Sequence, residues 1–285
     1  MLGGGYVYGS VWFYLEWLHA FHTSLCLDFG NPAIFALSYS AAPHSTYPAQ
    51  INEANNGYAY IRKFLPFGSH GINICIAGDS AGAALAMMVV HGLLRTKASN
   101  FAPQNLPSQV LLISPWLSLN PSLAAVTDSD FVTMTGLRAC AKAYAPSSDG
   151  HSINEDASVM RKLSHDWPDR FDVLGEQPQQ QSPVSGPASR PVFHIWYGTN
   201  ETLHNEIAAA CKALRQKGWT VQTIVEGAPD KAIHVWPVAA FYLSRKQGRR
   251  LESVRMLSSL LYRGYNDLPA QESRDGCGSG EDGSI

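Results

Sequence analysis

Short apolar runs recur along the chain and are separated by longer segments of mixed character. Each run is six or seven residues long. Near-continuous apolar character over such a length is typical of parallel strands that are covered on both faces of a sheet. The predicted strands are Ala33–Tyr39, Ile72–Gly78, Val110–Pro115, Val192–Gly198 and Thr220–Glu226.

Segments with helical patterning lie between these runs. In one of them Leu203, Ile207 and Leu214 share a face, and Gly218 follows as a C-terminal stop. The predicted helices are Val11–His22, Pro48–Phe64, Ala81–Leu94 and Thr202–Lys217. This alternation predicts an α/β fold, in which right-handed crossovers place helices on both faces of a mostly parallel sheet.

Two regions interrupt the alternation. Residues 117–190 are too long for a plain connection between strands. We interpret them as a cap-like insertion with a helix at Thr135–Tyr144 and a mobile, polar, Pro-rich part at 176–189. The Gly- and Ser-rich residues 266–285 are expected to form a disordered tail, so residues 1–265 form a single domain.

Composition narrows the class of protein. Of the 285 residues, 45% are hydrophobic, which is enough for a large core. The net charge of -2 offers no basic field for nucleic acid. The five cysteines contain no CxxC pair, so we expect neither a zinc site nor a disulfide framework. A reducing compartment fits this usage, and the predicted location is cytoplasmic.

The apolar N-terminal region is a candidate targeting segment. Within residues 7–27, Glu16, His19 and His22 interrupt the apolar run, which argues against a membrane span. No Lys or Arg precedes Arg62, so a signal peptide is not indicated either. We therefore expect a buried amphipathic helix here.

The residues Gly78-Asp79-Ser80-Ala81-Gly82 match G-x-S-x-G. The bare motif is weak, because a helix start rich in small residues can produce it without any chemistry. Here it follows a predicted strand and opens a predicted helix, which is the strand–turn–helix geometry of a nucleophile elbow. We predict that Ser80 is a nucleophile held at the carboxyl end of the sheet, beside the N–H groups of the following helix.

Acyl transfer by a serine also needs hydrogen-bond donors for the oxyanion. Gly3-Gly4-Gly5-Tyr6 can supply backbone N–H groups without side chains, although a flexible N-terminal segment is an alternative reading. A dinucleotide loop fits poorly, because Tyr8 stands where the last Gly of G-x-G-x-x-G should be.

The base is expected to be the last residue of a Ser–acid–His order. His234 is the last of ten histidines and follows the last predicted strand. The acid should follow the preceding strand, where Glu201 and Glu206 are candidates, and Asp230 is a third possibility. We favour Glu201, which lies at the strand exit, and expect Glu206 to be solvated.

Several segments, taken in order, resemble the hormone-sensitive-lipase-like family of α/β-hydrolases. GGGYVYGS resembles its oxyanion segment, SYSAAPHSTYPAQINEA resembles its YRLAPEHPFPAALED stretch, and AGDSAGAAL resembles its nucleophile elbow. ETLHNEI and HVWP resemble its acid and histidine motifs, and the similarity spans Gly3 to Leu243. The resemblance implies Glu201 as the acid and the N–H groups of Gly4, Gly5 and Ala81 as oxyanion donors.

The chain departs from the family pattern in three respects. Leu2 replaces the His of HGGG, and Asn205 replaces the second acid of the acid motif. The chain also begins at the oxyanion segment, so the resemblance implies an N-terminal truncation that removes cap helices and strands. One such strand lies between the equivalents of Ala33–Tyr39 and Ile72–Gly78. We therefore expect these two segments either to pair directly or to leave a slot of unpaired backbone groups.

These features predict a carboxylic ester hydrolase that acts on a small-molecule ester and needs no metal or organic cofactor. Amide, carbamate or lactone hydrolysis is an alternative within the same chemistry. A non-catalytic small-molecule binder or an inactive truncated homologue is an alternative of another class. The sequence leaves the oligomeric state open.

Overall fold

A computed structural model provides the structure of the protein and describes residues 1–64, 73–95, 106–121, 129–174, 191–228 and 231–266. The predictions of a mobile segment at 176–189 and of a tail at 266–285 lie outside these residues, except that Asn266 ends a helix.

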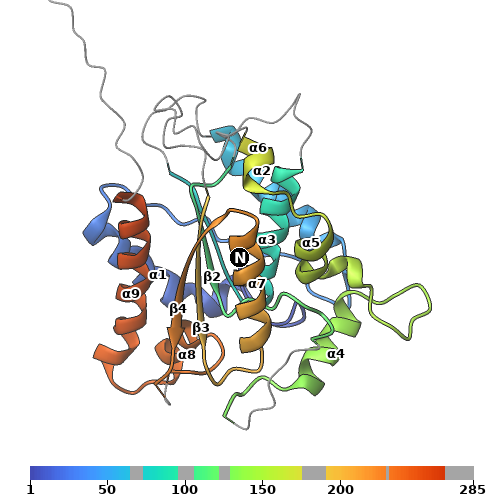
Figure 1. The fold of residues 1–285 in the computed structure, drawn as a ribbon. Helices are drawn as coiled ribbons and strands as arrows, with labels where there is room; N and C mark the ends of the chain where they lie inside the picture. The colour runs from blue at the N-terminus through green and yellow to red at the C-terminus, as the bar shows by residue number, and fades with distance from the viewer. Residues whose placement is uncertain (65–72, 96–105, 122–128, 175–190, 229–230, 267–285) are drawn as a thin grey trace, which may run out of the picture.

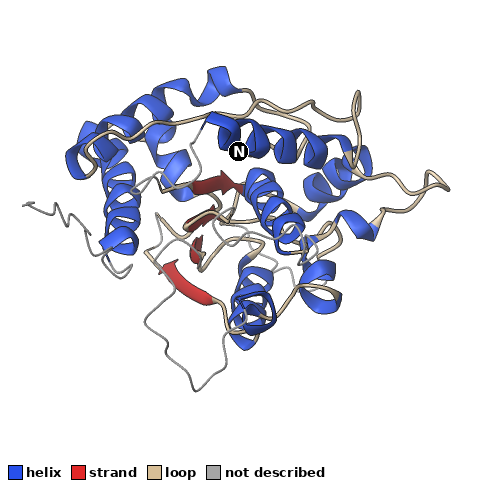
Figure 2. Ribbon diagram, turned by 90° about the horizontal axis from the view of Figure 1, so that it is seen from above, coloured by secondary structure: helices blue, strands red, loops and turns tan. Residues whose placement is uncertain are grey.

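A parallel sheet lies at the centre of the molecule (Figures 1 and 2). Its four strands follow one another in chain order. They are β1 (Cys75–Asp79), β2 (Gln109–Ile113), β3 (Val192–Gly198) and β4 (Thr220–Glu226), and each pairs in parallel with the next. Parallel neighbours place all four carboxyl ends at the same edge of the sheet, and the loops that leave this edge can therefore meet.

Helices cover both faces of the sheet (Figure 1). Residues along β2 alternate between two hydrophobic clusters: Val110 and Leu112 pack on one side, Leu111 and Ile113 on the other. The first side is covered by α2 (Ala49–Phe64), α3 (Ser80–Leu94), α5 (Val159–His165) and α7 (His204–Gln216). The second is covered by α1 (Val11–Asp28), α8 (Trp236–Leu243) and α9 (Gln247–Asn266). This layering confirms the predicted α/β class.

The connection between β2 and β3 contains α4 (Met134–Tyr144), the short 3₁₀ helix η2 (Glu155–Ala157), α5 and α6 (Arg170–Leu174). Thr133 caps α4 by accepting a hydrogen bond from the N–H of Gly136. The predicted helix at Thr135–Tyr144 is thus present.

Element boundaries follow the hydrophobic pattern closely in most cases. Strands β3 and β4 have the predicted bounds. Helix α1 begins at Val11 as predicted, where Ser10 accepts a hydrogen bond from the N–H of Phe13, but it continues six residues beyond the predicted end, from His22 to Asp28. Helix α9 was not predicted from the pattern, although Val254, Leu257, Leu260 and Leu261 form its buried face.

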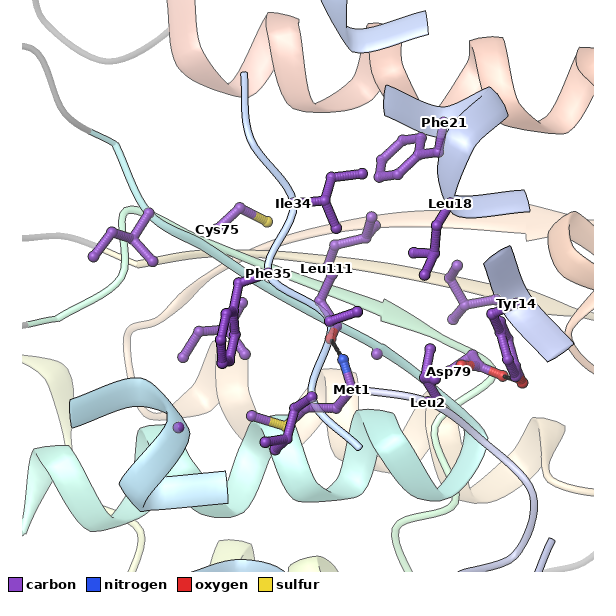
Figure 3. A pocket seen from close by; sticks show the side chains of 18 of the residues that line it. Met1, Leu2, Tyr14, Leu18, Phe21, Ile34, Phe35, Cys75, Asp79 and Leu111 are labelled. Carbon is purple, nitrogen blue, oxygen red and sulfur yellow. Dashed lines mark hydrogen bonds between the residues drawn. The ribbon is translucent and has the colours of Figure 1, made fainter. Parts of the chain in front are cut away.

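The prediction of a strand at Ala33–Tyr39 is wrong. The structure assigns no strand to this segment. The segment lies across a cavity from β1 (Figure 3), and no β-pairing joins the two within the described residues. A segment becomes a strand only when its N–H and C=O groups pair with a neighbouring backbone, and within the described part of the chain this segment belongs to no sheet.

The N-terminal region forms helix α1 as predicted, with Tyr14, Trp17, Phe21 and Leu25 buried. Within the described part of the chain, no helix is both long and apolar enough to cross a membrane.

Candidate active site

Ser80 lies at the junction between β1 and α3. Its φ of 49° is in the left-handed region, which costs a non-glycine residue energy and marks a sharp turn. Gly78 allows this turn, since a Cβ there would lie 2.4 Å from backbone atoms of Gly82. The strand therefore meets the helix so closely that Ser80 is held at the carboxyl edge of the sheet.

His234 lies opposite Ser80 and joins it to Glu201. The Nε2 atom of His234 is 3.0 Å from Ser80 Oγ, and its Nδ1 atom is 2.9 Å from Glu201 Oε2. All three side chains are buried. The structure thus brings together the three residues that the sequence singled out, one directly after β1 and the other two from the loops that follow β3 and β4.

The carboxylate of Glu201 is held by two further donors. Its Oε1 atom accepts hydrogen bonds from Gly198 N–H at 2.6 Å and from the hydroxyl of Ser114 at 3.2 Å. Ser114 follows β2 and accepts a hydrogen bond from Val235 N–H at 2.9 Å. The hydroxyl of Ser114 therefore links the loop of the acid to the loop of the histidine.

The surroundings of His234 shift its proton affinity. Burial lowers the pKa of His234, but the hydrogen bond and charge of Glu201, with smaller contributions from Asp130 and Asp79, raise it above its ordinary value. The imidazolium is the form that these carboxylates stabilise, which suits a group that takes up a proton during a reaction.

Asp130 is a positioning residue that sequence reasoning missed. Its Oδ1 accepts from His234 N–H at 3.2 Å, and its Oδ2 accepts from Thr202 N–H at 2.8 Å. It thereby ties the backbone of the histidine to the residue that follows Glu201. No motif marks Asp130, because its partners lie 104 and 72 positions away along the chain.

The glycine run lies beside Ser80 at the start of the chain. Gly4 has a φ of 120°, and a Cβ there would lie 2.0 Å from the carbonyl oxygen of Tyr8, so only glycine fits. Among the described residues, the N–H groups of Gly4, Gly5 and Ala81 have no protein acceptor.

Asp79 attaches this run to the strand that carries Ser80. One carboxylate oxygen accepts from Gly3 N–H at 2.9 Å and the other from the hydroxyl of Tyr14 at 2.8 Å. Burial raises the pKa of Asp79, although the hydrogen bonds from Tyr14 and Gly3 oppose the shift. Asp79 stands at a variable position of G-x-S-x-G, so motif spacing does not report its contacts.

Of the other two candidate acids, Glu206 lies within the described residues and Asp230 does not. Glu206 is buried in the first turn of α7, with 3% of its surface exposed, so the expectation that it is solvated is wrong. Asp230 lies outside the described residues. Among the described residues, no cluster of His, Cys, Asp or Glu side chains could hold a metal ion.

This fold is that of an α/β hydrolase. A protein-family model with the description alpha/beta hydrolase fold matches residues 2–236 of the sequence. The chain therefore belongs to this family, and within it to the hormone-sensitive-lipase-like members.

Curated relatives include an acetyl-hydrolase of Streptomyces hygroscopicus and human hormone-sensitive lipase. The first is 27% identical over 239 residues, which are 82% of this chain and 66% of that protein. The second is 29% identical over 139 residues, which are 47% of this chain and 12% of that protein. The chain thus spans just under two thirds of the acetyl-hydrolase and a small part of the lipase.

Solved structures show the same fold. An esterase/lipase from an uncultured bacterium aligns with a TM-score of 0.66 at 18% identity and covers 93% of this chain and 75% of that one. The structure of EstE5 soaked with p-nitrophenyl butyrate aligns with a TM-score of 0.65 at 19% identity, covering 93% and 76%.

Proposed function

We propose that the protein is a carboxylic ester hydrolase in which Ser80 is the nucleophile, His234 the general base and acid, and Glu201 the residue that orients His234. The observation that carries this proposal is the continuous chain of contacts from Ser80 Oγ through His234 to Glu201, at 3.0 and 2.9 Å. Hydrogen-bond contact between nucleophile and base, with the base held by a third group, is the arrangement that activates a serine hydroxyl.

In the first half of the reaction, Ser80 Oγ attacks the acyl carbon while its proton passes to His234 Nε2. The tetrahedral oxyanion is stabilised by the N–H groups of Gly4, Gly5 and Ala81, which have no acceptor within the described protein. The bond to the leaving alcohol then breaks, and His234 gives that oxygen the proton. An acyl ester of Ser80 remains.

In the second half, His234 takes a proton from a water molecule that attacks the acyl carbon. Collapse of the second tetrahedral species returns the proton to Ser80 Oγ and releases a carboxylic acid. The charge of Glu201 stabilises the imidazolium in both halves, because its carboxylate is buried and held by other donors on its second oxygen.

The test is hydrolysis of p-nitrophenyl butyrate by the Ser80→Ala variant. We expect kcat/KM to fall by about 10³-fold or more, since the nucleophile is removed. A fluorophosphonate probe should label Ser80 in the wild type, which mass spectrometry of the peptides would locate. Ser164→Ala is the matched control, because Ser164 is an exposed serine on α5 and the same atom is deleted. Activity retained in Ser80→Ala would exclude this mechanism.

A further inference from the structure

Phe131 lies beside the proposed base, on the segment that leads from β2 to α4. The centroid of its ring is 5.9 Å from that of the His234 imidazole, and the two rings meet edge to face at 66°. This is one of the arrangements that aromatic pairs prefer. The imidazole is buried, whereas 59% of the surface of Phe131 is exposed. One part of the ring therefore contacts the base, and the rest is open to a ligand.

The backbone on both sides of Phe131 is held by the loops of the candidate acid and base. On one side, Asp130 accepts hydrogen bonds from the N–H groups of His234 and Thr202, at 3.2 and 2.8 Å. On the other side, Val132 C=O accepts from the Thr202 hydroxyl at 2.7 Å, and the Val132 side chain packs against the core. Because both neighbours are fixed, the ring of Phe131 has a defined position relative to His234.

The stability of the fold does not explain a phenylalanine at this position. Hydrophobic stabilisation scales with the apolar area removed from water, and most of the surface of Phe131 stays accessible. Isolated apolar side chains are common on protein surfaces. Phe131 differs from them because it is fixed next to the group proposed to move the proton. An open aromatic face at such a place is typical of a surface that recognises a ligand.

The proposed reaction determines which part of an ester comes closest to Phe131. His234 Nε2 is 3.0 Å from Ser80 Oγ and gives its proton to the leaving oxygen, so that oxygen comes within about 3 Å of the same nitrogen. The acyl oxygen is directed instead to the N–H groups of the glycine run and of Ala81. The alcohol substituent therefore extends from the leaving oxygen past the imidazole, beside which Phe131 lies.

We propose that Phe131 is a specificity-determining residue that contacts the leaving alcohol, and that the protein prefers esters of arylmethyl alcohols, such as benzyl esters. This inference rests on the proposed function. A ring attached one carbon beyond the leaving oxygen reaches the open face of Phe131, and two aromatic rings gain more from contact than the burial of their area provides. A saturated ring of similar size lacks that gain, and a small alcohol such as ethanol does not reach Phe131.

The test compares kcat/KM for benzyl, cyclohexylmethyl and ethyl butyrate in the wild type and in Phe131→Ala. We expect the variant to lose about tenfold with benzyl butyrate, as for a lost apolar contact in a substrate pocket. The loss with ethyl butyrate should be less than about twofold, because the reacting groups are untouched. Phe131→Trp should keep the preference for the benzyl over the cyclohexylmethyl ester, and Phe131→Leu should lose it. Phe64→Ala is the matched control, since it deletes the same side chain from an exposed position on α2 and should change none of these ratios.

An equal loss with all three esters would overturn the inference, because Phe131 would then act only by orienting His234. A changed preference between ethyl acetate and ethyl butyrate, with the benzyl-to-ethyl ratio unchanged, would overturn it as well, since Phe131 would then contact the acyl chain. Hydrolysis with every ratio unchanged refutes this inference and leaves the proposed function standing.

The contact with Phe131 is also measured without turnover, by NMR titration of benzyl butyrate into Ser80→Ala. Adding Phe131→Ala to this variant should weaken binding by about fivefold, the effect of losing one aromatic contact. If the wild type hydrolyses no ester, the proposed function fails and this titration decides the inference by itself. Equal affinities of the single and double variants would overturn it.

Discussion

At the scale of single residues, the site depends on how carboxylate oxygens are shared among donors. Glu201 gives one oxygen to Gly198 N–H and the Ser114 hydroxyl, which leaves the other for His234. A buried carboxylate with its second oxygen occupied cannot rotate away from the imidazole. Asp130 applies the same principle to the backbone, because its two oxygens hold His234 N–H and Thr202 N–H.

Replacing Asp130 by Asn should change the pH dependence of hydrolysis. In the proposed mechanism His234 accepts a proton only when neutral, so kcat/KM should rise with pH as the imidazolium loses its proton. The charge of Asp130 helps to raise the pKa of His234, and removing that charge lowers it. The acidic limb of kcat/KM should therefore move to lower pH by up to about one unit, as measured with p-nitrophenyl butyrate.

A matched control is Asp169→Asn, which removes a carboxylate whose ion pair with Lys217 is exposed. Its pH profile should coincide with that of the wild type. A shift of the Asp130→Asn profile to higher pH would contradict the argument, since it would mean that Asp130 does not stabilise the imidazolium.

At the scale of elements, the junction of β1 and α3 controls where Ser80 stands. The strand, the serine and the helix are consecutive, so no loop absorbs a change in the angle between them. The close approach of Gly78 to Gly82 sets that angle. The same strand carries Asp79, which holds the glycine run through Gly3. One short strand therefore places both the hydroxyl of Ser80 and the candidate oxyanion donors.

The Gly78→Ala variant should be less stable and nearly inactive. Its Cβ would lie 2.4 Å from the backbone of Gly82, which must move. We expect a loss of about 1–3 kcal/mol in the free energy of unfolding, the range for overpacking, and a fall in kcat/KM because Ser80 moves with the helix. Urea denaturation and p-nitrophenyl butyrate hydrolysis measure the two effects.

Gly92→Ala is the matched control within the same element. A Cβ at Gly92 would meet only Asn55 Oδ1, at 3.8 Å, and alanine favours a helix over glycine by about 1 kcal/mol. This variant should keep its activity and gain slightly in stability. Equal losses in both variants would show that helix α3 tolerates no added methyl group and that the junction is not special.

At the scale of the whole molecule, α9 joins the two helices that flank the site. It packs against α1, which follows the glycine run, and against α8, which follows His234. Ser253 Oγ donates to Pro237 C=O, and Ser258 Oγ donates to Asp28. The contacts of α9 thus fix how the glycine run, with the candidate oxyanion donors, is placed relative to the loop that carries His234, the candidate base.

The Leu257→Ala variant should lower stability substantially without touching the site. Leu257 is fully buried between these helices, and removing such a side chain costs about 2–5 kcal/mol. Urea denaturation followed by circular dichroism measures the loss. Arg255→Ala, two residues away and exposed, should change stability by no more than about 0.5 kcal/mol. Equal effects in the two variants would contradict the packing role of α9.

The hydrophobic pattern predicted those elements in which the apolar periodicity along the chain agrees with the backbone pairing in the structure. Strands β3 and β4 were found with their bounds because both lie within the sheet and have backbone neighbours. The segment Ala33–Tyr39 has the same apolar character but pairs with no strand among the described residues, and an apolar pattern carries no information on whether a pairing partner is present. Helix α9 was missed although Val254, Leu257, Leu260 and Leu261 recur at helical spacing.

By itself, the sequence determined the α/β class and the place of Ser80 after a strand, and it singled out His234 and Glu201 as candidates. Each of these depends on local order along the chain, which motifs and periodicity report directly. Only the tertiary structure revealed Asp130, Ser114 and Asp79 as residues that hold the candidate site. Their contacts join positions far apart in the chain, and such contacts arise from packing, which no local pattern encodes.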